Sequence, residues 1–205
     1  MGQRERLLSA ARRLLAERGY ARTTSRDLAA AADANVASIN YHYGSKEELL
    51  TAALLETVDA WGEKVVHTPG EAPPEAGGTK TGAGAAATGA ERRQRFATMW
   101  KAVIESYVTD RAMIVSTIEA LSQAGRLPGV REQIAAAYER SREPMGVAFP
   151  GVDPGDEQAV RAVGSVHMAL VAGLSLQWLV DPENAPSADD VALGLQAMLD
   201  ALRPE

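Results

Sequence analysis

Short polar and cationic side chains gather between residues 24 and 46, and they are the groups in this chain best suited to contact another molecule. Their hydroxyl, amide, imidazole and cationic groups suit the phosphate oxygens of DNA, and their amides and methyl groups suit base edges. None of them is a nucleophile with an evident base beside it. The pattern therefore indicates binding. The residues concerned are Thr24, Ser25, Arg26, Asn35, Val36, Ala37, Ser38, Asn40, Tyr41, His42 and Lys46.

Few features of the chain suit an enzyme. There is no cysteine, and the three histidines, His42, His67 and His167, do not have the spacing of metal ligands. Neither a Gly-x-Ser-x-Gly turn nor a glycine-rich phosphate loop occurs. We expect no catalytic residue, no metal ion and no cofactor.

The charge is unevenly distributed along an otherwise ordinary globular composition, with 46% hydrophobic and 23% charged residues in a chain of 205. The net charge is −6, yet residues 1–46 hold eight Lys or Arg against four Asp or Glu, a net +4, which leaves −10 for the remainder. A basic head on an acidic body suits phosphate contact by the head alone.

The hydropathy pattern predicts neither export nor membrane insertion. The N-terminus lacks the continuous apolar stretch and cleavage site of a signal peptide. The most apolar run, Val166 to Val180, is interrupted by polar residues and is shorter than the roughly 20 residues that a bilayer requires. We expect a cytoplasmic protein without a membrane partner, and a buried helix at this run.

The elements that position the polar run are two short helices. Thr24 can cap a helix that reaches Ala32, Asp33 tolerates a tight turn, and Asn35 can cap a second helix from Val36 to about Tyr41. Two short helices so close together form a helix-turn-helix. In that motif the second helix enters the major groove and the first lies across the backbone.

Helices are also predicted on both sides of this pair. Apolar residues recur on one helical face from Leu7 to Leu15, before a C-cap candidate at Gly19. Ser45 and Glu48 have the spacing of a capping box for a long helix that reaches Val65. Residues 1–46 are therefore taken as the DNA-binding domain and 47–66 as a connecting helix.

The rest of the chain divides into an insertion and a helical body. Residues 68–90 contain nine Gly or Pro in 23 positions and no large apolar side chain, so 67–90 is predicted to be a flexible low-complexity insertion. Helical periodicity then covers 91–109, 110–124, 130–142 (ending before Pro144), 156–180 and a last segment capped at Ser187. No strand pattern of useful length occurs, so the class is all-α, with 91–205 as a helical domain.

Residues 24–50, TSRDLAAAADANVASINYHYGSKEELL, resemble the DNA-binding head of the TetR family of bacterial transcription regulators. The specific elements are Thr24, the small residues 29–32, the aromatic signature 41–43 and the segments Gly44-Ser45-Lys46 and Glu48-Leu49-Leu50. Asp33 stands where the family usually has glycine, but aspartate can adopt the left-handed conformation. Tyr43 stands where phenylalanine is more frequent, so its hydroxyl needs a partner; we expect Tyr43 rather than Tyr41 in the core of the head.

The resemblance implies a ligand-sensing body, although no motif in that half of the chain supports it. Aromatic, methionine and polar residues could line a cavity between helices, and Glu105, Glu119 and His167 could orient a ligand; for each, an ordinary core or surface role stays open. The candidates for the cavity are Phe96, Met99, Trp100, Val103, Tyr107, Met113, Thr117, Tyr138, His167 and Met168.

The resemblance also implies a homodimer in which the last two helices of each subunit pack together. The apolar helix before residue 180 has small residues that permit close approach of another helix. The candidates for this interface are Gly164, Ala169, Leu170, Gly173, Trp178, Leu195, Met198 and Leu202.

The function expected from these observations is a dimeric repressor that binds double-stranded operator DNA and is released by an unidentified small molecule. Two alternatives stay open. One is an activator of the same family, which the sequence does not distinguish. The other is a helical adaptor that binds protein instead of DNA, against which the basic head argues.

Overall fold

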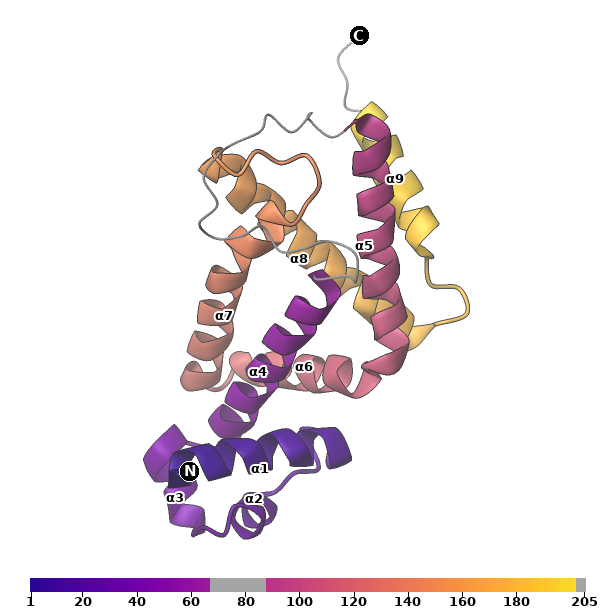
Figure 1. Ribbon diagram of the computed structural model, residues 1–205. Helices are drawn as coiled ribbons and strands as arrows, with labels where there is room; N and C mark the ends of the chain where they lie inside the picture. The colour runs from indigo at the N-terminus through magenta and orange to yellow at the C-terminus, as the bar shows by residue number, and fades with distance from the viewer. Residues whose placement is uncertain (67–87, 202–205) are drawn as a thin grey trace. The chain divides into compact units, whose positions relative to one another are not determined.

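The computed structural model describes residues 1–66 and 88–201, and all the regular structure in these ranges is helical (Figure 1). Most of the predicted insertion at 67–90 lies outside the described residues, as does Leu202. The expected all-α class is confirmed. The helices are α1 (Gln3–Arg18), α2 (Ser25–Ala31), α3 (Val36–Tyr43), α4 (Lys46–Val66), α5 (Gly89–Thr109), α6 (Arg111–Ala124), α7 (Pro128–Val147), α8 (Glu157–Val180) and α9 (Ala188–Ala201).

The chain forms two compact units, and their boundaries differ from those of the predicted domains. The first unit comprises Met1–Gly62 and Asp110–Ser141, and the second comprises Glu63–Thr109 and Arg142–Glu205. The difference arises because α6 and α7 contribute Ala120, Val130 and Ile134 to the core of the head. Two of the three boundaries fall inside continuous helices, α4 and α7, and the third lies between α5 and α6.

The core of the first unit is aliphatic. Leu7 and Leu28, from α1 and α2, are fully buried, and Leu49 and Leu50 of α4 join them. The apolar stripe predicted in the first helix is thus confirmed as its buried face. Burying each such side chain stabilises the fold by about 1.5–3 kcal/mol.

Helix ends in the first unit follow the local sequence. Gly19, with φ of 80°, ends α1, and Asp33 has φ of 48°, the left-handed conformation that the turn between α2 and α3 requires. Thr24 and Asn35 cap α2 and α3 through their side-chain oxygens. The predicted helix-turn-helix is therefore confirmed.

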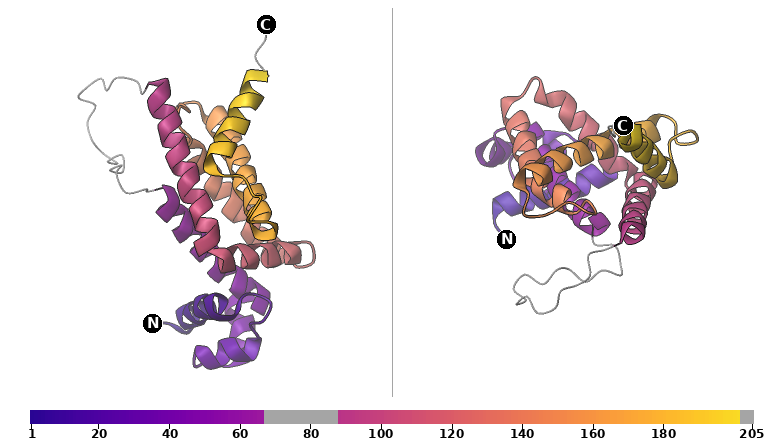
Figure 2. Two further views of the ribbon diagram at one scale, coloured as in Figure 1. Left: turned by 90° about the vertical axis from the view of Figure 1, so that its right-hand side faces the viewer. Right: turned by 90° about the horizontal axis from the view of Figure 1, so that it is seen from above.

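In the second unit α5 contacts both α8 and α9, and Figure 2 shows these helices beside one another. Asp156 caps α8 by accepting a hydrogen bond from the Ala159 N–H, and Ser187 caps α9 by accepting one from Asp190. The cap at Ser187 was predicted, and Asp156 was predicted as the start of its helix.

Two expectations about the helices were wrong. α7 does not end before Pro144 but runs through it to Val147; one proline removes a single N–H and does not end a helix that is packed on both sides of it. α8 is not buried within the chain, because only 17% of its most apolar 18-residue window is buried.

Candidate functional site

The second helix of the helix-turn-helix, α3, is anchored by one side chain and presents the others outward. Ile39 is 1% exposed and belongs to the core of the first unit, whereas Val36, Ala37 and Asn40 are exposed. Asn35 stands at the N-cap, where its Oδ1 accepts a hydrogen bond of 3.0 Å from the Ala37 N–H. α3 thus offers a row of small and amide side chains held rigidly by its buried face.

The two tyrosines at the end of α3 have opposite environments, as expected. Tyr41 is 85% exposed, and its ring meets that of His42 edge-on at 4.9 Å between centroids. Tyr43 packs against the core, donates a hydrogen bond of 2.9 Å to the carbonyl oxygen of Arg4, and lies 5.1 Å from the Arg4 guanidinium. Burial raises the pKa of Tyr43. The hydroxyl that distinguishes Tyr43 from phenylalanine therefore has its partner within the chain.

His42 has a partner on another helix. Its Nε2 lies 3.2 Å from Oε1 of Gln3, so the ring is held between α3 and the start of α1. His42 is half-buried, whereas Tyr41 beside it projects into solvent. Only the tyrosine is free to reach a partner without breaking a bond inside the chain.

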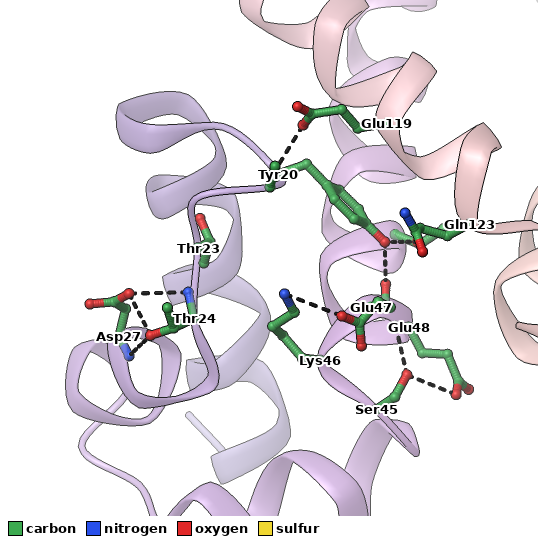
Figure 3. Close-up of polar contacts among 12 residues, drawn as sticks. Tyr20, Thr23, Thr24, Asp27, Ser45, Lys46, Glu47, Glu48, Glu119 and Gln123 are labelled. Carbon is green, nitrogen blue, oxygen red and sulfur yellow. Dashed lines mark hydrogen bonds and ion pairs between the residues drawn. The ribbon is translucent and has the colours of Figure 1, made fainter. Parts of the chain in front are cut away.

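α2 begins with a reciprocal cap (Figure 3). Thr24 Oγ1 accepts a hydrogen bond from the Asp27 N–H at 3.2 Å and donates one to Asp27 Oδ2 at 2.6 Å. The hydrogen bonds that the Thr24 hydroxyl and N–H donate to the Asp27 carboxylate, with the Arg18 guanidinium at 2.9 Å, lower the pKa of Asp27. The first turn of α2 also carries Ser25 and Arg26, whose side chain is exposed.

α4 begins with a second cap. Ser45 Oγ accepts a hydrogen bond from the Glu48 N–H at 3.0 Å, as the capping box predicted, but its hydroxyl donates to Glu48 Oε1, also at 3.0 Å. The Glu48 carboxylate was expected to accept from a backbone N–H. Lys46, the last predicted DNA contact, lies 3.2 Å from the carboxylate of Glu47.

The loop between α1 and α2 is tied to two other helices of the first unit (Figure 3). The Tyr20 hydroxyl donates to the carbonyl oxygen of Glu47 at 3.0 Å and lies 3.1 Å from the Thr51 hydroxyl, and its burial raises its pKa to about 12. The Ala21 N–H donates to the carboxylate of Glu119 on α6 at 3.0 Å. Glu119, a candidate ligand contact, thus holds the head in place. Tyr20 was missed, because a lone tyrosine after a helix carries no spacing signal.

The second unit contains a cluster of four rings, the α5–α8 ring cluster, formed by Phe96 and Trp100 of α5, His167 of α8 and Phe149 of the segment between α7 and α8. Ring centroids lie 5.5 Å apart for Trp100 and His167, 5.7 Å for Phe149 and His167, and 5.4 Å for Phe96 and Phe149. Phe149 follows α7 in a turn-rich segment and was missed; its one signal was an aromatic residue among turn formers.

Trp100 and His167 are almost fully buried, at 0% and 3% exposed. His167 Nδ1 lies 3.0 Å from the carbonyl oxygen of Met145, and burial lowers the pKa of His167. Nearby, Tyr107 donates a hydrogen bond of 2.8 Å to the Val171 carbonyl oxygen, and its pKa is raised by burial.

Comparison with known protein families gives two matches that together cover most of the chain. Residues 7–53 match bacterial regulatory proteins of the tetR family, and residues 91–202 match the tetracyclin repressor-like C-terminal domain. The chain belongs to the TetR family. It is therefore a DNA-binding transcription regulator and not an enzyme, as expected, and the helical adaptor is disfavoured.

Solved structures of similar fold include other regulators. A transcriptional regulator from Streptomyces coelicolor A3(2) is 26% identical, with a TM-score of 0.59, over 96% of this chain and 97% of that one. One from Rhodococcus sp. RHA1 is 18% identical, with a TM-score of 0.66, over 97% and 96%. The multidrug binding protein EbrR, complexed with proflavin, is 22% identical, with a TM-score of 0.62, over 96% and 99%. No curated protein matches the chain.

The ten residues considered for the TetR ligand cavity divide between the two units. Met113, Thr117 and Tyr138 fall in the first unit, where Met113 packs against the aliphatic core and Tyr138 is 41% exposed. The second unit holds the other seven. These are Phe96, Met99, Trp100, Val103, Tyr107, His167 and Met168.

The residues considered for the dimer interface also divide. Gly164 is buried within the second unit, where a Cβ would collide with the carbonyl oxygen of Arg142, so its close approach is to α7 of the same chain. A Cβ on Gly173 would meet nothing within 4 Å. Ala169 and Met198 are exposed. Leu170, Trp178 and Leu195 are half-buried, and the Trp178 indole N–H donates to the Pro186 carbonyl oxygen at 3.1 Å.

Proposed function

We propose that this TetR-family regulator is a cytoplasmic, homodimeric repressor that leaves its operator when a small molecule binds in the second unit. The observation that carries the DNA-binding part is the exposure of Asn40 and Tyr41 on α3, a helix held from behind by buried Ile39. Repression needs only occupancy of a promoter, so a rigid reading head suffices for it.

The reading residues are those of α3 and its N-cap. Amide groups can contact adenine edges, and methyl groups can contact thymine. Asn35, Ala37, Ser38 and Asn40 carry these groups, and Val36 adds an apolar contact. The residues proposed to hold phosphate are Thr24, Ser25, Arg26, Tyr41, His42 and Lys46, of which Thr24, Arg26 and Tyr41 are exposed.

The test is a DNA titration with the intergenic DNA upstream of the gene, across a salt series. Wild-type protein is expected to prefer one fragment, with affinity that falls steeply as salt rises. Asn40→Ala should weaken binding by about tenfold, since one good base contact contributes about 1–3 kcal/mol. Tyr41→Ala should also weaken it by about tenfold, since a hydrogen bond to a charged phosphate contributes about 1.5–3 kcal/mol. Both side chains are exposed, so the variants should keep the wild-type melting temperature.

Matched controls are Gln94→Ala and Tyr138→Ala, which remove an exposed amide and an exposed tyrosine that belong to helices other than α3. They should bind DNA as wild type does. If all four variants bind equally, α3 is not the reading helix. If no fragment of upstream or genomic DNA is preferred over random sequence, operator binding itself is refuted.

Dimerisation is proposed through α8 and α9 of two copies. α8 is long and apolar enough to cross a membrane by length and composition, but it belongs to a regulator domain in which α5 packs beside it. Large apolar side chains remain exposed on both helices, and soluble monomers rarely leave such patches uncovered. They include Val166 at 59%, Leu176 at 47%, Leu193 at 70%, Met198 at 66% and Leu199 at 61%.

Sedimentation equilibrium with Leu193→Glu and Met198→Glu tests this interface. Each places a charge where the second copy is proposed to pack, so the dimer should dissociate at micromolar protein concentration. Val108→Glu is the matched control, because Val108 is an apolar residue that is 66% exposed on α5, a helix outside the proposed interface. A wild-type monomer, or variants that remain fully dimeric, would exclude this interface.

Release by a ligand is proposed to follow from linkage. Two heads of one dimer can occupy successive major grooves only if their separation matches the DNA repeat, about 34–36 Å. A ligand that prefers a conformation with another separation must weaken DNA binding. α4 and α7 each contribute residues to both units, so they connect a ligand in the second unit with the head. The EbrR complex with proflavin supports a small-molecule site on this fold.

A promoter fusion distinguishes repression from activation. Deleting the gene should raise expression of a reporter placed behind the bound fragment, and restoring it should lower expression again. Falling expression on deletion would make the protein an activator. The conclusions from the DNA titration and the ultracentrifugation do not depend on which of the two is found.

A further inference from the structure

The α5–α8 ring cluster contains two polar atoms with no partner inside the protein. Among the described residues, only four buried side-chain nitrogen or oxygen atoms lack a hydrogen bond, and two of them are Trp100 Nε1 and His167 Nε2. Both belong to side chains that are at least 97% buried, and their rings are neighbours at 5.5 Å. A buried polar group without a partner costs about 1–3 kcal/mol, so two side by side require a reason.

The chemical character of each atom follows from its surroundings. An indole N–H can only donate. The Met145 carbonyl oxygen can only accept, so His167 Nδ1 carries the proton that joins them at 3.0 Å. In the neutral imidazole, which burial favours, Nε2 is then a hydrogen-bond acceptor. The cluster therefore presents one donor and one acceptor.

The rings around these two atoms are flat and carry no permanent charge. Phe96 and Phe149 complete the set of rings, with centroids 6.1 Å from Trp100 and 5.7 Å from His167, respectively. Aromatic side chains favour a flat aromatic ligand through stacked or edge contacts. None of the four residues supplies a permanent charge to pair with an ionic ligand, and burying an unpaired charge is costly.

We infer that the effector of this regulator is an uncharged, flat aromatic molecule with a hydroxyl group, which donates to His167 Nε2 and accepts from Trp100 Nε1. The inference rests on the proposed function, in which the second unit holds the ligand. A hydroxyl both donates and accepts, so this single group complements both protein atoms. A carboxylate could accept from the indole but not donate to the imidazole, and an ammonium group has the opposite defect.

The first test is a set of matched probes titrated by calorimetry into the full-length wild-type protein without DNA. 2-Naphthol has the ring and the hydroxyl, 2-methoxynaphthalene keeps the oxygen but cannot donate, naphthalene has neither, and N-methylquinolinium is flat and cationic. We expect 2-naphthol to bind about tenfold tighter than 2-methoxynaphthalene, and naphthalene and N-methylquinolinium to bind more weakly still. Equal affinity for the four, tighter binding of the cation, or no binding would each overturn the inference.

The second test removes one polar atom at a time. Trp100→Phe removes the indole N–H, and His167→Asn removes Nε2 while its amide can still donate to the Met145 carbonyl oxygen. Each should weaken 2-naphthol binding about tenfold and leave naphthalene binding unchanged. Trp178→Phe is the matched control, because its N–H is bonded to Pro186. Equal effects on both probes would mean lost packing and would overturn the hydrogen-bonding assignment.

Both variants are expected to melt lower than wild type, because each replaces a buried ring by a smaller side chain. The probe affinities therefore decide between a ligand site and a structural water. If a water bridges the two atoms permanently, 2-naphthol should gain nothing over naphthalene, which overturns the inference. The probe titrations do not depend on the variants folding.

A parallel DNA titration keeps this inference apart from the proposed function. 2-Naphthol should release the protein from its upstream fragment, and the two variants should need about tenfold more of it. Binding of 2-naphthol without release would refute ligand-controlled repression but keep the site. Release by other compounds, with no preference for 2-naphthol, would keep the repressor and refute the site.

Discussion

The reading head and the α5–α8 ring cluster handle buried polar groups in opposite ways. In the head, the Tyr20 hydroxyl has both Glu47 and Thr51 within hydrogen-bonding distance, and Tyr43 donates to Arg4. In the ring cluster, Trp100 and His167 each keep one buried atom without a partner. Hydroxyl groups that are paired in this way fix the positions of the segments they join, which a surface that must match DNA needs. An unpaired donor and acceptor can instead form hydrogen bonds with a bound ligand.

The largest effect that would break the rigid side of this comparison is expected from Ile39→Ala. Ile39 is 1% exposed and is the buried residue of α3, so truncation leaves a cavity that should cost about 2–5 kcal/mol of unfolding free energy. Urea denaturation measures it. Val36→Ala, on the same helix at 40% exposed, should cost under about 1 kcal/mol. Similar losses for both would mean that α3 is not anchored by its buried side.

The comparison is tested directly by removing one paired and one unpaired group. Tyr20→Phe removes a hydroxyl that is bonded to Glu47 and close to Thr51, and should cost about 1–2 kcal/mol because the partners lose their bonds. Trp100→Phe removes an N–H that has no partner. The loss of this N–H should therefore lower the free energy of unfolding much less than the loss of the Tyr20 hydroxyl does. Urea unfolding curves of both variants measure the difference. If Trp100→Phe is the more damaging, the indole ring's packing outweighs its unpaired N–H.

A smaller effect is expected at the first turn of α2. Thr24→Ala should cost about 1 kcal/mol, since it removes the side-chain oxygen that caps the helix. Thr24→Ser keeps that oxygen and should retain most of the stability. DNA affinity can be measured on the same samples: if Thr24→Ser folds normally but binds DNA poorly, the threonine contributes to DNA contact beyond its role as a cap.

How far the sequence predicted these regions depends on the range of the interactions. The caps at Thr24, Asn35 and Ser45 and the left-handed Asp33 are local, so residue type and spacing suffice to predict them. The Ala21–Glu119 hydrogen bond joins residues 98 positions apart, and no periodicity records such a pair.

The body was predicted less well for the same reason. Apolar content marked α8 but could not tell burial within the chain from burial against a second copy. Gly164 was correctly identified as permitting close approach, yet its neighbour is α7 of the same chain. Phe149 reaches the ring cluster from a turn, where no helical pattern exists to place it.

The pH dependence of stability is the finest test of the comparison, because both regions bury a tyrosine hydroxyl. Burial raises the pKa of Tyr20 to about 12, from 10.0 for an exposed tyrosine, so below pH 10 the hydroxyl is protonated in the folded and unfolded states alike. Above pH 10 the unfolded chain loses this proton first, and stability falls as the pH rises towards 12. At pH 10.5 the loss from Tyr20 should stay under about 1 kcal/mol.

Tyr107 in the second unit should behave in the same way, since burial raises its pKa as well. Unfolding curves at pH 8.0 and 10.5 for wild type, Tyr20→Phe and Tyr107→Phe separate the two contributions. Each variant should lose less stability between the two pH values than wild type does, because it lacks one of the hydroxyls that the unfolded chain ionises. If Tyr107→Phe matches wild type while Tyr20→Phe does not, the second unit admits water to its buried hydroxyl, and the polar atoms of the ring cluster would then be expected to be hydrated as well. A reduced loss in both variants would mean that the two regions exclude water equally and differ only in whether their polar atoms have partners.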